Sequence, residues 1–208
     1  MIPAIHTGSS TIEKGLSMDT NLQVRTVMGG ADLQVRKLEK VFASFDTDAD
    51  GVIDLLDFTG MAQIYCDAYG IAPRTERWRK IHGCALVMWR AVEQRTGTLN
   101  PAKLTKQDWV SWMGSNEYAD FVMRAAIPFS MAAFSIADAD NDGRCDVDEM
   151  MAAQRRSGMS EEEVRRSFDL LDSDGDGYVT AENFAQALEE FYFSGDPDAP
   201  GNSIAGDL

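Results

Sequence analysis

The stretch Asp138–Gly143 reads Asp-Ala-Asp-Asn-Asp-Gly, and its acidic side chains occupy alternate positions before a glycine. The pattern recurs at Asp46–Gly51 and at Asp172–Gly177. A hard divalent cation takes six to eight oxygen ligands, so a short loop that binds one must bring several carboxylates to a single point. The glycine permits the sharp bend that a Cβ would obstruct. The sequence therefore predicts three cation-binding loops.

Each pattern extends to a twelve-residue frame in which positions 1, 3, 5, 9 and 12 offer side-chain oxygens and position 7 offers its carbonyl. This frame is the calcium loop of the EF-hand motif. The predicted metal ligands are Asp46, Asp48, Asp50, Val52, Asp54 and Asp57; Asp138, Asp140, Asp142, Arg144, Asp146 and Glu149; and Asp172, Asp174, Asp176, Tyr178, Thr180 and Asn183.

Apolar residues flank the loops at helical spacing. Leu38, Val41 and Phe45 precede the first loop, and Val164, Phe168 and Leu171 precede the third. Residues three or four apart share one helix face, so this spacing indicates amphipathic helices that bury a stripe. An acidic linker built only of turns would not need such a stripe. We therefore predict an all-α fold of helix-loop-helix units.

EF-hands pair through a short antiparallel bridge, so three hands imply a fourth. A helical pattern over residues 74–94 is followed by a possible twelve-residue loop, 97–108, which has Leu104 at position 8 and Asp108 at position 12. Positions 1, 3 and 5 carry Gly97, Leu99 and Pro101, which have no side-chain oxygen, so we expect no metal there. Two bridges are predicted, Ile53 with Leu104 and Cys145 with Val179.

Position 12 distinguishes the three loops. Glu149 can bind an ion with both carboxylate oxygens. The shorter Asp57 tends to bind with one oxygen, which favours six-coordination and therefore suits Mg²⁺ better. Asn183 is neutral and offers one oxygen. We therefore expect Ca²⁺ to bind most tightly in the Asp138 loop, less tightly in the Asp46 loop, where Mg²⁺ competes, and least tightly in the Asp172 loop.

The formal net charge of −15 argues against nucleic acid as a partner, because phosphate backbones are bound by clustered Lys and Arg. The longest apolar run, residues 125–137, is too short for a bilayer, and the chain opens without a leader-like segment. Cys66, Cys84 and Cys145 are far apart and suggest free thiols. We expect a cytoplasmic monomer without catalytic activity, since no nucleophile-base pattern or phosphate loop is present.

The predicted organisation has four parts. Residues 1–30 form a mostly flexible arm, with one short helix about Asp19–Val27, and residues 194–208 form a tail. Residues 31–115 hold the first hand pair and residues 116–193 the second. The linker at 114–128 contains Phe121, Val122 and Ile127, which favour burial, so a compact two-lobe body is expected rather than a dumbbell.

Residues 33–196 resemble the sarcoplasmic calcium-binding proteins, and most closely their bacterial calerythrin type. The resemblance rests on four hand positions with the second decayed, on Pro128 ten residues before Asp138, and on the Phe191-Tyr192-Phe193 ending of the last helix. It implies a compact four-hand fold that buffers or transports calcium. The family's loops usually end in Glu, so Asp57 and Asn183 are departures.

Three functions remain open. The first is an intracellular calcium buffer with sealed helix faces, and the second is a sensor that exposes an apolar groove to an unknown protein target. Of the eleven methionines, Met88, Met113, Met123 and Met131 fall in stretches that read as core, which favours the buffer. The third is a chromophore-binding relative of the photoproteins, which resemble this architecture but hold their ligand with several His, Tyr and Trp side chains. Only His6 and His82 are present here.

Overall fold

The computed structural model describes residues 30–96, 103–112, 115–156 and 159–208. The predicted arm, apart from Gly30, lies outside these ranges, as does its short helix. The elements are α1 (Gly30–Phe45), β1 (Val52–Ile53), α2 (Leu55–Ala68), α3 (Glu76–Thr96), β2 (Leu104–Thr105), α4 (Lys106–Ser111), α5 (Asn116–Phe121), the π-helical η1 (Val122–Ala126), α6 (Ile127–Ala137), β3 (Arg144–Cys145), α7 (Val147–Arg156), α8 (Glu161–Leu171), β4 (Val179–Thr180), α9 (Ala181–Phe193) and the 3₁₀ helix η2 (Pro200–Ala205). The fold is all-α, as predicted.

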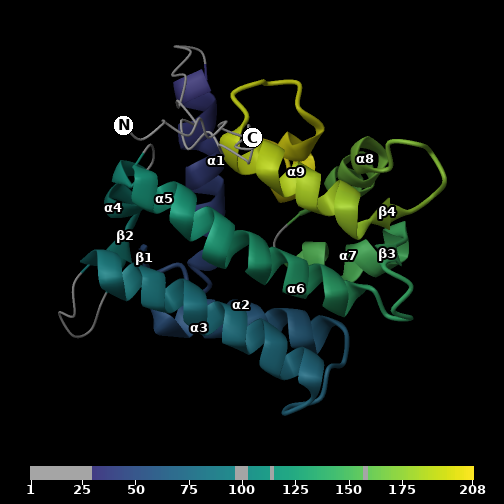
Figure 1. Ribbon diagram of the computed structural model, residues 1–208, viewed down its shortest axis with the longest axis horizontal. Coiled ribbons are helices and arrows are strands. Elements are labelled where there is room, and N and C mark those ends of the chain that lie inside the picture. Colours follow the sequence, from purple (N-terminus) through teal and green to yellow (C-terminus); the bar gives the residue numbers. More distant parts are fainter. Residues whose placement is uncertain (1–29, 97–102, 113–114, 157–158) are drawn as a thin grey trace, which may run out of the picture.

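Two antiparallel bridges pair the helix-loop-helix units and lie at opposite ends of the molecule (Figure 1). In β1–β2, Ile53 is opposite Leu104, and in β3–β4, Cys145 is opposite Val179. Both predicted pairs are therefore confirmed. All four side chains are almost completely buried, because position 8 of each loop points into the core beneath its bridge.

The second hand retains its frame in the residues that the structure describes. Helix α3 covers the predicted helical stretch, whereas positions 1 to 6 of its loop lie in the undescribed range 97–102. Thr105 caps α4: its hydroxyl accepts from the Asp108 N–H at 3.2 Å, and the Asp108 carboxylate accepts from the Thr105 N–H at 3.3 Å. Aspartate thus closes a capping box in which Glu or Gln is usual.

A nearly continuous helical run, α5–η1–α6, crosses the centre of the molecule (Figure 1). Pro128 lies in the first turn of α6, as expected, but α6 follows η1 without a break. A π turn absorbs the irregularity: the Ile127 N–H donates to the Val122 carbonyl five residues back. The 117–137 run is apolar and long enough for a membrane span by composition, but half of it is buried inside the protein.

One apolar core joins the two halves of the molecule. Phe45 of α1 lies 5.1 Å from Phe58 of α2 and 6.1 Å from Phe129 of α6, measured between ring centroids. The same cluster includes Trp109 of the second hand and Phe191 of the last helix. Because helices from both hand pairs supply this core, the lobes are fused, and the predicted compact form is confirmed.

Two expectations about burial need correction. Met123 is half exposed, on the outer side of η1, whereas Met88 is fully buried. Val122, Ala125 and Ala126 are buried at a spacing of three and four residues, so Met123 lies on a different face of this helix. Met113 lies outside the described residues. Ile127 is only partly buried, unlike Phe121 and Val122.

Polar contacts also join α1 to the end of α9. The Lys37 ammonium donates to the Ser194 carbonyl at 2.9 Å, and Gln34 donates to the same carbonyl at 2.5 Å. A cation at a helix C-terminus complements the partial negative charge of the last carbonyls. Burial lowers the pKa of Lys37 to about 8, against a smaller opposing effect of Glu190.

The C-terminal tail packs back on the body. Gly201 is buried against α9, where an added Cβ would lie 2.3 Å from the Ala187 carbonyl oxygen. Asp207 pairs with Arg166 of α8 at 2.6 Å and accepts from the Lys40 ammonium of α1 through its carbonyl at 2.8 Å. The tail therefore contacts helices of both lobes.

Candidate metal centres

The three acidic loops share one backbone frame. In each, the position-1 aspartate accepts the N–H groups of positions 5 and 6: Asp46 does so at 3.1 and 3.1 Å, Asp138 at 3.1 and 3.0 Å, and Asp172 at 3.1 and 2.9 Å. The position-6 glycines have φ near +87°, at +85°, +89° and +87°, a region that side chains with a Cβ rarely adopt. The glycine of the sequence pattern is thus required by the turn.

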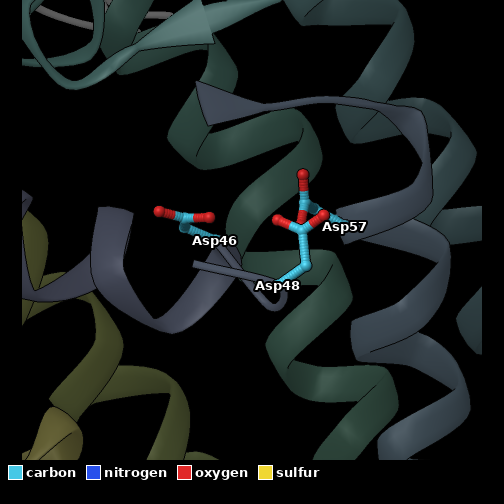
Figure 2. A group of neighbouring side chains, drawn as sticks. All are labelled: Asp46, Asp48 and Asp57. Carbon is cyan, nitrogen blue, oxygen red and sulfur yellow. The ribbon is translucent and has the colours of Figure 1, made fainter. Parts of the chain in front are cut away.

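Asp46, Asp48 and Asp57 converge in the first loop, with one carboxylate oxygen of each within 4.8 Å of the others. They come from the end of α1, the loop and the first turn of α2 (Figure 2). Asp57 is buried and holds the two ends of the loop together. Its carboxylate accepts from the Thr47 N–H at 2.9 Å and the Asp54 N–H at 2.8 Å. This donor set, made of oxygen atoms, suits a hard divalent cation.

Asp138, Asp140 and Glu149 form the corresponding group in the second acidic loop, again within 4.8 Å. Glu149 closes the loop with both oxygens, which accept from the Ala139 N–H at 3.0 Å and the Asp146 N–H at 3.1 Å. Asp138 is buried, with 6% of its surface exposed. A buried acidic group of this kind needs a compensating cation or donors.

The first lobe contacts this loop directly. Arg77 of α3 donates to the Asp138 carbonyl at 3.0 Å and to the Asn141 side chain. Tyr69, which follows α2, donates its hydroxyl to the Glu149 carbonyl. Sequence reasoning missed both residues, because they lie more than 60 positions from their partners and belong to no motif.

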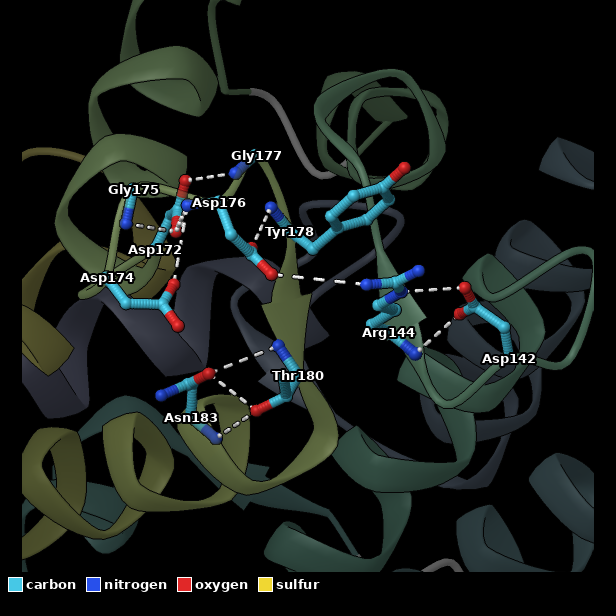
Figure 3. A network of polar contacts seen from close by, with 10 residues as sticks. All are labelled: Asp142, Arg144, Asp172, Asp174, Gly175, Asp176, Gly177, Tyr178, Thr180 and Asn183. Carbon is cyan, nitrogen blue, oxygen red and sulfur yellow. Dashed lines mark hydrogen bonds and ion pairs between the residues drawn. The ribbon is translucent and has the colours of Figure 1, made fainter.

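The third loop closes less completely. Asp172, Asp174 and Asp176 converge within 4.8 Å, but no acid stands at position 12. The Asn183 side-chain oxygen accepts from Thr180, at 2.5 Å from the hydroxyl and 3.3 Å from the N–H (Figure 3). The Asn183 amide nitrogen lies 3.5 Å from the Ser173 hydroxyl. In the other two loops the position-12 carboxylate accepts the position-2 N–H instead.

Replacing Asn183 by glutamate should strengthen this site. A carboxylate would supply charge and a second oxygen, and could reach the Ser173 N–H side of the loop, as Glu149 reaches Ala139. We expect Ca²⁺ affinity at the Asp172 loop to rise by about tenfold, because ligand charge count and rigidity tune the affinity of such loops over several orders of magnitude. Calorimetric titration of the variant would test this, and Asn183→Gln, which lengthens the side chain without charge, is the control. Equal affinities in Asn183→Glu and the native chain would contradict the role given to position 12.

The remaining predicted ligands lie on the rims of the same loops. Position 7 is the first strand residue in two loops, Val52 in β1 and Arg144 in β3. In the third loop it is Tyr178, which directly precedes β4. At position 9, Asp54 and Thr180 cap the following helices, and Asp146 accepts the Glu149 N–H at 2.8 Å. All eighteen positions fall in described residues. Their role as metal ligands remains a proposal.

Two perturbed groups show how charge is distributed near the second bridge. The side-chain hydrogen bond from Arg144 lowers the pKa of Asp142. Burial, and to a smaller extent neighbouring carboxylates, raise the pKa of the Cys145 thiol. A thiol held neutral under the bridge serves as a small apolar filler.

Comparisons with known proteins agree with this geometry. A family profile for an EF-hand domain pair matches residues 130–199, and one for a single EF hand matches residues 38–61. Calerythrin of Saccharopolyspora erythraea is 22% identical over 161 residues, which cover 76% of this chain and 90% of calerythrin. The structure of a Streptomyces coelicolor calcium-binding protein, described in terms of prokaryotic calcium-mediated regulation, is 28% identical with a TM-score of 0.65 and covers 78% of this chain and 99% of that one.

A third similarity concerns the fold alone. Coelenterazine-binding protein from Renilla muelleri has a TM-score of 0.63 at 18% identity, over 86% of this chain and 98% of that chain.

The paired hands and the acidic loops define an EF-hand calcium-binding protein. The similarities to calerythrin and to the Streptomyces coelicolor protein support an EF-hand protein of the calerythrin type.

Proposed function

We propose that this protein is a calcium buffer with three ion sites, in the loops that begin at Asp46, Asp138 and Asp172. The observation that carries the proposal is the fused core. Helix faces that a sensor would present to a target are here packed against the other lobe: Phe129 contacts Phe45 of α1 and Tyr65 of α2, and the Phe191 ring lies under the Lys37 ammonium of α1. Opening them would expose this core to water, at about 25 cal/mol per Å².

The contacts of Arg77, Tyr69, Lys37 and the tail support the same proposal, since each joins the two lobes. The free cysteines fit a reducing, cytoplasmic location, which we include in the proposal. Mg²⁺ would compete best at the Asp46 loop, because Asp57 is shorter than Glu149.

The sensor hypothesis predicts that calcium exposes apolar surface. Leu86 and Val87 of α3 and Met123 are already 43–50% exposed, but they lie outside the fused core. For a buffer, the fluorescence of an apolar-surface dye should change by less than about twofold when Ca²⁺ is added, because compact EF-hand buffers barely open. Calmodulin, which opens, is the positive control. A several-fold calcium-dependent rise in dye fluorescence would support the sensor instead.

The chromophore hypothesis has in its favour a cavity of about 240 Å³ between the lobes, lined by Tyr65, Tyr69 and Tyr192 among others, whereas a wider hollow of about 760 Å³ is lined largely by charged and polar side chains. Pockets for drug-sized ligands are larger than this cavity, about 300–1,000 Å³. His82 does not line this cavity and stacks on Trp78, with 4.0 Å between ring centroids. The buffer therefore remains the better-supported function.

A further inference from the structure

A cation at position 7 of one loop reaches the position-5 aspartate of the partner loop in both hand pairs. In the second pair, Arg144 lies 4.0 Å from Asp176 of the other loop and 2.8 Å from Asp142 of its own (Figure 3). In the first pair, Lys103 of the decayed loop lies 3.7 Å from Asp50. The antiparallel bridges bring these positions together, because position 7 adjoins the bridge on each side.

The Arg144 guanidinium lies between the two loops, in contact with side chains of both. The Tyr178 ring lies beneath it at 4.0 Å from the ring centroid, close enough for a cation–π contact. Figure 3 shows the side chain extended between Asp142 and Asp176, with the tyrosine ring alongside. Because residues of both loops contact the guanidinium, a change in either loop alters its surroundings.

Arg144 therefore stands where it affects both proposed ions. Asp142 and Asp176 are the proposed position-5 ligands. A divalent ion bound to either carboxylate would weaken the attraction of that carboxylate for the Arg144 guanidinium. The ion would also repel the guanidinium directly. The bridging position of Arg144 is thus less favourable when an ion is bound at either loop than when both loops are empty. The guanidinium in that position therefore opposes the binding of both ions.

We propose that Arg144 couples the two ion sites of the second hand pair, so that binding at one raises the affinity of the other. The first ion must displace Arg144 from its bridging position, and the second ion binds after that displacement has been made. A shared two-state element that both ligands bias in one direction gives positive, reciprocal coupling. The inference rests on the proposed function, since it takes both loops as ion sites.

Lys103 supplies a comparison within the same chain. It faces Asp50 as Arg144 faces Asp176, but its own loop carries no ligand side chains at positions 1, 3 and 5. It should lower the affinity of the Asp46 loop without coupling that loop to a second ion. Both cations are partly exposed, at 43–44%, so each effect is that of a screened pair, about two- to fivefold, and decreases as salt is added.

The test is a Ca²⁺ titration of the full chain followed by NMR at three backbone amides. Gly51, Gly143 and Gly177 each donate to the position-1 aspartate of their own loop and so report the three sites separately. Coupling is the ratio of the affinity read at Gly143 in the native chain to that in Asp172→Ala. The same ratio is then measured with Arg144→Gln, which keeps the backbone carbonyl at position 7.

The expected coupling ratio in the native chain exceeds one by about two- to fivefold and falls toward one with Arg144→Gln. In the Asp172→Ala background, Arg144→Gln should raise the affinity at Gly143. Lys103→Gln should raise the affinity at Gly51 and leave the readings at Gly143 and Gly177 unchanged. A ratio that Arg144→Gln does not alter would overturn the inference while leaving the buffer intact. Failure of the native chain to bind Ca²⁺ at all would instead overturn the proposed function.

Discussion

Replacing Asp138 by alanine should remove one of three bound Ca²⁺ ions and lower the affinity of its loop by at least about a hundredfold, since the loss of an outer-shell partner alone costs 10- to 100-fold. Asp138 is the position-1 ligand proposed for the tightest site. Its carboxylate also accepts the Asp142 and Gly143 N–H groups, so its loss removes a ligand and loosens the turn that positions the others. Calorimetric titration of native and variant chains gives the number of ions directly.

The matched control is Asp148→Ala. Asp148 is an exposed acid in the first turn of α7, eleventh in the same loop, and supplies no proposed ligand. It changes the net charge by the same amount as Asp138→Ala, so a purely electrostatic effect would be shared by the two variants. Unchanged stoichiometry in Asp138→Ala would show that the ranking of the three sites is wrong.

Removal of divalent ions with a chelator should lower the melting temperature by about 15–30 °C. A ligand present at a hundred times its dissociation constant stabilises the native state by about 2.7 kcal/mol at one site, and thus by about 8 kcal/mol at three. For a chain of this size, each kcal/mol corresponds to roughly 2–4 °C. Three divalent ions would also change the formal net charge from −15 to −9, which relieves repulsion within the loops.

Differential scanning calorimetry with and without chelator measures this shift. A fused core should melt in one transition rather than two, because Phe45, Phe129 and Phe191 belong to a single cluster. High salt should restore only the part of the loss that comes from screened repulsion. A melting temperature that the chelator leaves unchanged would contradict metal binding as a source of stability.

The hand pairing could be read from the sequence because the motif determines its geometry locally. A twelve-residue loop places position 8 on the bridge, so counting along the chain was enough to pair Ile53 with Leu104 and Cys145 with Val179. The decayed hand was found in the same way, from the spacing of Leu104 and Asp108. These features depend on neighbours in the chain.

Features that depend on tertiary packing could not be read from the sequence. Nothing near Tyr69 or Arg77 indicates that they reach the Asp138 loop, and the docking of the tail through Gly201 follows from close contact with α9. The π turn at Val122–Ala126 carries no sequence signal of its own. The cross-loop contacts of Arg144 and Lys103 could have been found by comparing position 7 between paired loops.

Three acidic loops of unequal closure should bind three calcium ions, and isothermal titration with Ca²⁺ in the absence and presence of Mg²⁺ measures both the number and the order of these sites. We expect three ions per chain. Mg²⁺ should lower the Ca²⁺ affinity most at the site of intermediate affinity, assigned to the Asp46 loop, and least at the tightest site, assigned to the Asp138 loop. Fewer than three ions per chain, or three equivalent sites that Mg²⁺ weakens equally, would contradict this expectation.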